Sequence, residues 1–219
     1  MRMLLDFTRP IQHGMPVYPG EPEVLMEYRQ TVPYATVALS LSTHSGTSVD
    51  TPKHVFPDGA TMDAYPLHRW RSHGGVIMLK NLKDRQPIEP EHLAAAVVGF
   101  SHLLPGSFLL IRTGWEHQWA SERYFDHPYL SQDAARWLVE KQVSLVGVDT
   151  PNTDASLTDE DQVHQILLSH DVLVAENLCG FDPLLEKSCT FIPLREVWMV
   201  PLPLARADGS PVRCFASLE

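Results

Sequence analysis

Two histidines and an aspartate lie close together in residues 43–54, which read THSGTSVDTPKH. Asp50 follows His44 by six residues and precedes His54 by four, so the three side chains could converge on one point. Imidazole and carboxylate groups are common ligands of Zn²⁺, Mn²⁺ and Fe²⁺. Surface loops often carry a histidine or two, however, so this spacing alone is a weak signal of a metal site.

Two residues further along the chain could complete such a site. His164 lies beside the apolar positions of an expected helix, from which its side chain could reach the edge of the core. Glu176 follows four apolar residues, 172–175 (VLVA), that predict a buried strand. A carboxylate there would be costly to desolvate unless a cation or hydrogen-bond donors met it. Alternatively, Glu176 simply emerges into solvent where the strand ends.

The composition limits the classes to which the chain can belong. With 219 residues, 44% of them apolar and 20% charged, it can bury a full core as one domain, expected over residues 1–219. A net charge of −10 argues against a nucleic acid or an anionic membrane as partner, because these are bound by a basic face. The longest apolar runs have the length of a strand, whereas a membrane span needs about 20 residues. The first residues lack a secretory signal pattern, so we expect a cytoplasmic protein.

The elements that must position these residues follow a β-rich and then an alternating pattern. Before about Leu82 the chain is rich in Pro, Gly and Thr, and strands are expected at 36–41 and 75–79. Beyond it, helices are expected at 90–97, at 132–142 and after Thr158, and strands at 107–112, 143–148, 172–176 and 197–200. Strand, helix and strand from 107 to 148 predict a parallel pair joined by a right-handed crossover. The predicted fold class is therefore α/β.

The third expected helix matters because it carries His164. The hydroxyl of Thr158 could cap it, and the acidic residues 159–161 would then stand in its first turn. Negative side chains at that end are favourable against the helix dipole. We therefore expect this helix to begin directly after Thr158.

Several stretches resemble one known family. Residues 43–56 (THSGTSVDTPKHVF) are similar to the HxGTHxDxPxH signature of the cyclase-like metal-dependent hydrolases, which include bacterial kynurenine formamidase and isatin hydrolase. Further matches follow in the same order at 15–22 (MPVYPGEP), 56–60 (FPDGA), 111–115 (IRTGW), 147–151 (GVDTP) and in the twelve-residue step from His164 to Glu176. The resemblance covers most of the chain and implies a swivelling β/β/α fold.

The resemblance also implies a set of metal ligands. Formamidases of this kind hold two ions, and the family's positions for the first carry His44, Ser48 and Asp50 in this chain. The positions for the second carry Asp50, His164 and Glu176. Ser48 stands where the signature has a histidine, and a hydroxyl is a far poorer ligand than imidazole for a transition metal. We therefore expect one ion per chain, Zn²⁺ or alternatively Mn²⁺, held by His44, Asp50, His164 and Glu176.

The function that the resemblance implies is hydrolysis of an amide, cyclic amide or lactone bond in a small, aromatic molecule, as in an arylformamidase. The metal would lower the pKa of a bound water and polarise the carbonyl group. His54 matches the family's acid/base, and Ser48 would hold a water or hydrogen-bond Asp50 beside the metal. Tyr18 and Trp70 are expected to line the substrate site, and the chain is expected to form a homo-oligomer, either a dimer or a tetramer.

A catalytically impaired family member that binds a small molecule or a partner subunit is the alternative. Ser48 favours it, whereas the retention of the other signature residues speaks against it. Around His117 and His127, the aromatic residues Trp119, Tyr124 and Phe125 indicate a loop that could cover a pocket. Aromatic residues in such loops more often pack than bind.

Overall fold

Seven strands close into a barrel in the computed structural model, which describes residues 3–158, 161–187 and 189–218. In order around the ring they are β12 (Gly209–Leu218), β11 (Phe191–Pro201), β5 (Arg71–Met78), β7 (Phe108–Arg112), β9 (Leu145–Val148), β10 (Leu173–Glu176) and β4 (Ser48–Asp50). The ring closes because β4 also pairs with β12. Outside it, β1 (Leu4–Asp6) pairs with β12. The site described below lies around β4, the strand that closes the ring.

Four neighbouring strands of the ring, β5, β7, β9 and β10, run parallel, and the remaining pairings are antiparallel. The parallel pairing of β7 with β9 through the intervening helix confirms the strand–helix–strand prediction. Their apolar runs suit strands that are covered on both faces. In β9, Gly147 is required by close packing, because a Cβ there would lie 2.7 Å from Leu178 Cδ1 and 2.8 Å from Leu110 Cδ2.

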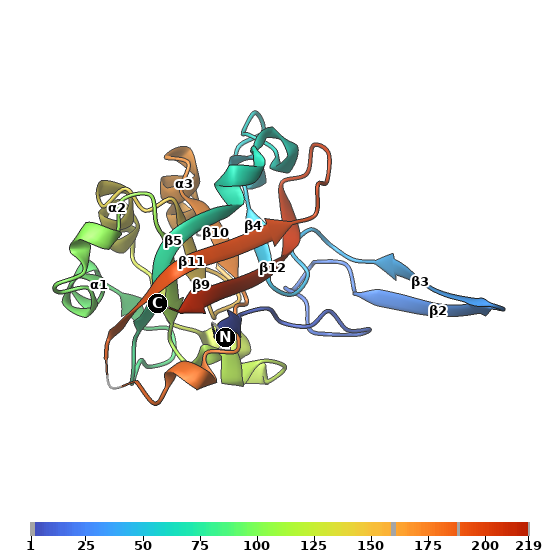
Figure 1. Ribbon diagram of the computed structural model, residues 1–219, viewed down its shortest axis with the longest axis horizontal. Helices are drawn as coiled ribbons and strands as arrows, with labels where there is room; N and C mark the ends of the chain where they lie inside the picture. The colour runs from blue at the N-terminus through green and yellow to red at the C-terminus, as the bar shows by residue number, and fades with distance from the viewer. Residues whose placement is uncertain (1–2, 159–160, 188, 219) are drawn as a thin grey trace.

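Three helices, α1 (Pro90–Ala96), α2 (Gln132–Glu140) and α3 (Gln162–Ser169), lie together on one side of the barrel (Figure 1). Side chains alternate along each strand, so Ile77 of β5 joins the core beneath these helices and Val76 joins the core inside the barrel. Two apolar cores on the two faces of one sheet thus hold the strand ends that carry the site. No helix in the described part of the chain is long and apolar enough to cross a bilayer.

The start of α3 differs from the sequence prediction. The helix begins at Gln162, and the Thr158 hydroxyl donates to the carbonyl of Ala155 (2.9 Å). Its first N–H groups are satisfied by Asp154, whose carboxylate accepts from the backbone N–H of Val163 (2.8 Å) and His164 (3.0 Å). The Asp154 carboxylate, from the loop before the helix, caps α3 because it accepts hydrogen bonds from two backbone N–H groups of the first turn, which have no partner within the helix. Residues 159 and 160 lie outside the described residues.

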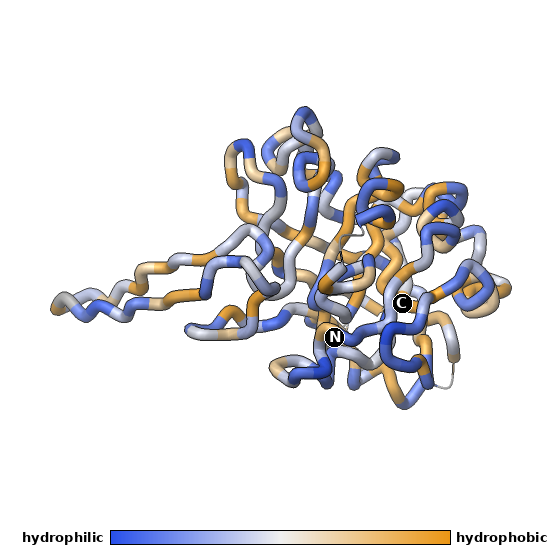
Figure 2. Tube along the Cα trace, turned by 180° about the vertical axis from the view of Figure 1, so that it is seen from behind, coloured by the Kyte–Doolittle hydropathy of each residue, from blue (hydrophilic) through white to orange (hydrophobic). Residues whose placement is uncertain are grey.

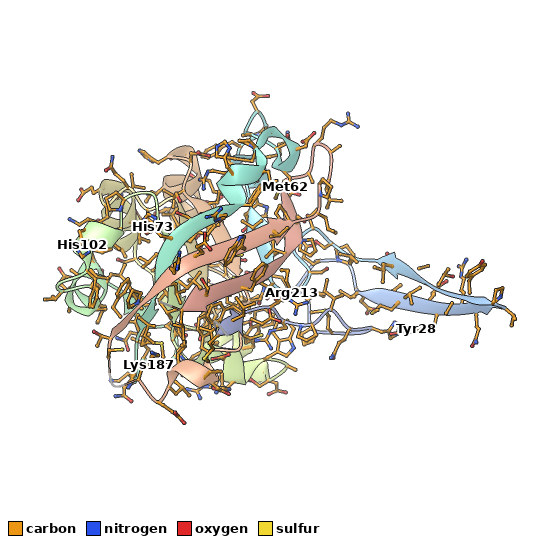
Figure 3. The ribbon with its side chains drawn as sticks, viewed as in Figure 1. Tyr28, Met62, His73, His102, Lys187 and Arg213 are labelled. Carbon is orange, nitrogen blue, oxygen red and sulfur yellow. The ribbon has the colours of Figure 1, made fainter. Side chains whose placement is uncertain are left out.

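A two-stranded ribbon of β2 (Leu25–Thr31) and β3 (Tyr34–Ser40) extends away from the barrel (Figure 1). The predicted strand at 36–41 therefore exists as β3, but it packs against neither core. Its register with β2 pairs Tyr28 with Val37, and both side chains are exposed. Figure 2 shows hydrophobic segments along the ribbon, and Figure 3 shows Tyr28 on it, clear of the barrel.

His127 is buried just before α2 and is uncharged. Its Nδ1 donates to the carbonyl of Pro128 (2.8 Å), so in the neutral ring Nε2 accepts from the Ser156 hydroxyl (2.7 Å). Burial lowers the pKa of His127 from 6.5 to about 4. Between these two pH values the unfolded chain binds a proton that the folded chain does not.

We expect the free energy of unfolding to fall as the pH drops from 6.5 to about 4, with His127 responsible for about 3 kcal/mol. The sign follows because the unfolded state binds more protons in this window, which favours unfolding at the acidic end. Urea unfolding at several pH values checks this, with His127→Gln as the comparison. The variant should lose less stability than the wild type on acidification, and parallel curves for the two proteins would contradict the assignment.

Candidate active site

The strand β4 carries the first residues of the site. Its register places Asp50 opposite Val174 of β10, and Ser48 opposite Glu176. Ser48 and Asp50 share one face of the strand because side chains alternate along it. Both are buried. The pairing of β4 with β10 therefore brings together the Ser48 hydroxyl and the carboxylates of Asp50 and Glu176.

His164 reaches this end of the sheet from α3. Its Nε2 lies 3.3 Å from Glu176 Oε1 and 3.5 Å from Asp50 Oδ2. Its Nδ1 lies 2.7 Å from Asp154 Oδ2, to which it donates a hydrogen bond. The loop carboxylate that caps α3 therefore also orients the ring, so that Nε2 faces two acidic side chains. A histidine whose second nitrogen is held by a carboxylate is a common arrangement at metal sites.

His44 stands between two carboxylates. Its Nδ1 lies 2.8 Å from Asp50 Oδ1, and its Nε2 lies 2.9 Å from Asp208 Oδ2. Burial lowers the pKa of His44, but Asp50 and Asp208 raise it more, to about 11. Carboxylates only accept hydrogen bonds, so both ring nitrogens carry a proton unless a cation replaces one of them.

The charges of the cluster fit a divalent cation. Burial disfavours the charged form of Asp50, but His44 and the other histidines hold its pKa well below the usual range. Burial and the nearby charge of Asp50 raise the pKa of Glu176, although a hydrogen bond from His164 opposes this. A cation would stabilise both carboxylates in their charged forms. Two imidazoles and two carboxylates form a donor set suited to Zn²⁺ or Mn²⁺.

The four predicted ligands are thus linked by direct contacts, from His44 through Asp50 and His164 to Glu176. His54, the predicted acid/base, ends a short 3₁₀ turn that begins at Pro52. Its ring centroid lies 4.4 Å from that of His44 and 5.7 Å from that of His164. One of its ring nitrogens lies within 4.8 Å of ligand atoms of Asp50 and His164.

A cavity of about 430 Å³ opens onto this cluster. His44, His54, His164 and Glu176 line its polar part, and the lining also includes Pro16, Val17, Tyr18, Trp119, Tyr124 and Phe125. The predicted covering loop thus contributes its three aromatic residues to the cavity. The rings of Tyr18 and Phe125 meet edge to face, 5.6 Å apart. A pocket with a polar end lined by histidines and an aromatic wall suits a small aromatic molecule.

The two predicted substrate residues have different places. Tyr18 lines the cavity, and its hydroxyl accepts from the backbone N–H of Leu157 (3.1 Å). Trp70 does not line it: the side chain is 5% exposed, lies in the core inside the barrel and packs against Tyr65. The structure therefore does not bring Trp70 to the cavity, because the turn before β5 directs this large apolar side chain inward. The role of Ser48 stays a prediction.

Two residues in contact with these histidines were missed by the sequence analysis. Asp208 and Asp154 both lie in loops, and Asp208 precedes a glycine in a pattern that reads as an ordinary turn. Local sequence gives no sign that either carboxylate meets a histidine, because Asp208 is 164 residues away from His44.

Comparison with known proteins gives consistent matches. A family model described as "Putative cyclase" matches residues 5–155. The kynurenine formamidase of Bordetella petrii is 32% identical over 220 residues, which cover 98% of this chain and 98% of the relative. The kynurenine formamidase of Bacillus anthracis is 29% identical and covers 95% and 94%, respectively.

Solved structures share the fold. A protein described as a potential metal-dependent hydrolase with cyclase activity superimposes with a TM-score of 0.74 at 25% identity, covering 100% of this chain and 99% of that one. Isatin hydrolase A from Ralstonia solanacearum gives a TM-score of 0.82 at 20% identity, covering 99% and 92%. The predicted α/β fold of this family is thereby confirmed.

Proposed function

Because the chain belongs to the putative cyclase family, we propose that it is a metal-dependent hydrolase that cleaves an amide, cyclic amide or lactone bond in a small aromatic molecule. One observation carries the proposal: His44, Asp50, His164 and Glu176 form a continuous cluster, in which the last three are buried and His44 is partly buried, at the polar end of a cavity with an aromatic wall. The similarity to kynurenine formamidases supports an arylformamidase-like activity.

In this proposal one divalent ion per chain, Zn²⁺ or Mn²⁺, is held by His44, Asp50, His164 and Glu176. When bound, it supplies a Lewis acid that activates water and polarises the carbonyl group of the substrate. Asp154 keeps the His164 ring oriented through its 2.7 Å contact with Nδ1. The cation also removes the cost of burying two carboxylates side by side.

His54 moves the proton in the proposed reaction. It borders the cavity and is not one of the four proposed ligands, so in this proposal its imidazole accepts the proton of the attacking water. It returns that proton to the nitrogen or oxygen that leaves when the C–N or C–O bond breaks. Tyr18, Trp119 and Phe125 would pack against the aromatic part of the substrate and hold its carbonyl group at the polar end.

The proposal is tested with a panel of formyl aryl amides, cyclic aryl amides and aryl lactones. Protein supplied with Zn²⁺ or Mn²⁺ should hydrolyse at least one class, and a chelator should abolish turnover until metal is restored. Formate release or ring opening provides the readout. If metal-loaded protein turns over no member of the panel, the hydrolase proposal fails.

The alternative is a catalytically impaired member that binds a small molecule in the same cavity. Ser48 is the specific feature that favours it, because the signature histidine is absent at this position. A panel compound that raises the melting temperature without being hydrolysed would support this alternative.

The Ser48→His variant tests how many ions the site holds. Elemental analysis of protein purified without chelator should give about one ion per chain for the wild type, and a value rising toward two for the variant, because imidazole adds a nitrogen ligand beside Asp50. The melting temperature of the variant shows whether the larger side chain is accommodated at this buried position. A folded variant with unchanged metal content would contradict a lost ligand at Ser48.

We further propose a cytoplasmic homo-oligomer in which the ribbon of β2 and β3 packs against a second copy of the chain. Strand alternation puts Tyr28, Val37 and Leu39 on one face, whereas Arg29 lies on the other. A two-stranded ribbon is marginally stable on its own, and an apolar face of this kind favours a protein partner.

Light scattering should give the mass of a dimer or a tetramer. Tyr28→Ser should shift the protein toward the monomer because it removes the largest apolar side chain from that face. Arg29→Ser, on the opposite face, is the matched control. A monomeric wild type would contradict the proposed assembly.

A further inference from the structure

One carboxylate, that of Asp208, contacts two of the site's histidines at once. Its Oδ2 lies 2.9 Å from His44 Nε2 and 3.2 Å from His54 Nδ1. Since a carboxylate can only accept, both of these ring nitrogens act as donors. Asp208 thereby joins an expected metal ligand to the expected acid/base.

The carboxylate is held in place independently of the two imidazoles. Its other oxygen, Oδ1, accepts from the Thr43 hydroxyl (3.0 Å). Its backbone carbonyl accepts from both the N–H and the hydroxyl of Thr51, each at 2.9 Å. Thr43 and Thr51, on either side of Asp50 in the sequence, therefore both bond to Asp208, and this fixed frame can impose an orientation on rings that would otherwise rotate.

The contact also decides which nitrogen of His54 can take a proton. With Nδ1–H directed at Asp208, the neutral ring carries its lone pair on Nε2. A rotated ring or the other tautomer would offer the wrong atom to the substrate. The same carboxylate orients His44, because Nε2–H on Asp208 leaves Nδ1 directed at Asp50.

We propose that Asp208 is a positioning residue, whose carboxylate fixes the tautomer and orientation of His54 so that Nε2 accepts and returns the proton. The kinetic part of this inference rests on the proposed hydrolase function. Asp208 does not touch the reacting atoms and acts through His54. Because it also contacts His44, it fixes the position of His54 relative to the proposed metal ligands.

Asp208→Asn tests the kinetic consequence, because asparagine keeps the shape but removes the charge and one acceptor oxygen. We expect kcat to fall by about 10- to 100-fold, with KM and metal content nearly unchanged. In a His54→Ala background the same change should cause no further loss, because the two residues act as a unit. Loss of metal in step with loss of activity, or additive losses in the double variant, would overturn the proposal.

Asp63→Asn is the matched control. Asp63 supports the same loop by accepting from the backbone N–H of Arg206 (2.9 Å), and no hydrogen bond joins it to a histidine among the described residues. Its substitution should leave kcat within about twofold of the wild type, since surface changes of this kind have small effects. An equal loss of kcat in both variants would assign the effect to loop structure and overturn the proposal.

A readout independent of turnover separates this inference from the proposed function. Nitrogen chemical shifts of histidine-labelled protein at alkaline pH report the tautomer of His54, with His54→Ala providing the assignment. We expect protonated Nδ1 in the wild type and a mixture of tautomers in Asp208→Asn. Protonated Nε2 in the wild type, or no change in the variant, overturns the proposal. Absence of turnover together with the expected shifts would defeat only the hydrolase function.

Discussion

Replacing His54 by alanine should lower kcat/KM for the preferred substrate by about 10²- to 10⁴-fold. The side chain borders the cavity and lies within 4.8 Å of ligand atoms of Asp50 and His164, but it is not one of the four residues that we propose to hold the ion. The loss should therefore appear mainly in kcat, because the imidazole acts on the proton in the transition state and contributes little to substrate binding. Steady-state kinetics and metal analysis of the same preparation check both statements.

His117→Ala is the control for this substitution. His117 is an exposed histidine that lies 3.3 Å from Asp182 and does not line the cavity. Its removal should leave kcat/KM nearly unchanged. If His54→Ala retained full activity, another residue or the substrate itself would have to move the proton, and the assignment of His54 would be wrong. If it lost its metal, His54 would be a ligand instead.

Replacing Asp50 by asparagine should remove both the bound metal and all turnover. Asp50 is 1% exposed and contacts both His44 and His164, so it is the point where the two halves of the cluster meet. An amide carries no charge to offset a divalent ion, and Glu176 would then be the one charged carboxylate left among the four expected ligands. The expected metal content of the variant is close to zero.

Thermal unfolding with added metal gives a second measurement of this prediction. Free metal at about 100 times its dissociation constant should stabilise the wild type by about 3 kcal/mol and leave Asp50→Asn unaffected. Asp171→Asn is a suitable control, because this exposed aspartate accepts a hydrogen bond from Tyr65 away from the cluster. A variant that bound metal as tightly as the wild type would show that Asp50 is not a ligand.

Much of the barrel could be predicted from local sequence. The apolar runs that became β7, β9 and β10 predicted buried strands, and the helical segment that became α2 predicted the parallel pairing of β7 with β9. These predictions succeed because burial on both faces of a parallel strand requires a continuous apolar run, which is visible in the sequence. Of the ribbon, only the strand at 36–41 was predicted, and its polar and apolar alternation does not reveal that it leaves the barrel.

The sequence by itself determined which side chains of residues 43–54 are able to do chemistry, because spacing within one short segment limits how far His44, Asp50 and His54 can separate. Tertiary structure decided the rest. It brought Asp208 onto two of those histidines and Asp154 onto His164 and the start of α3. It also moved Trp70 from the expected substrate site into the core. Contacts between residues far apart in the chain depend on how the barrel closes, and no local pattern of residue types carries that information.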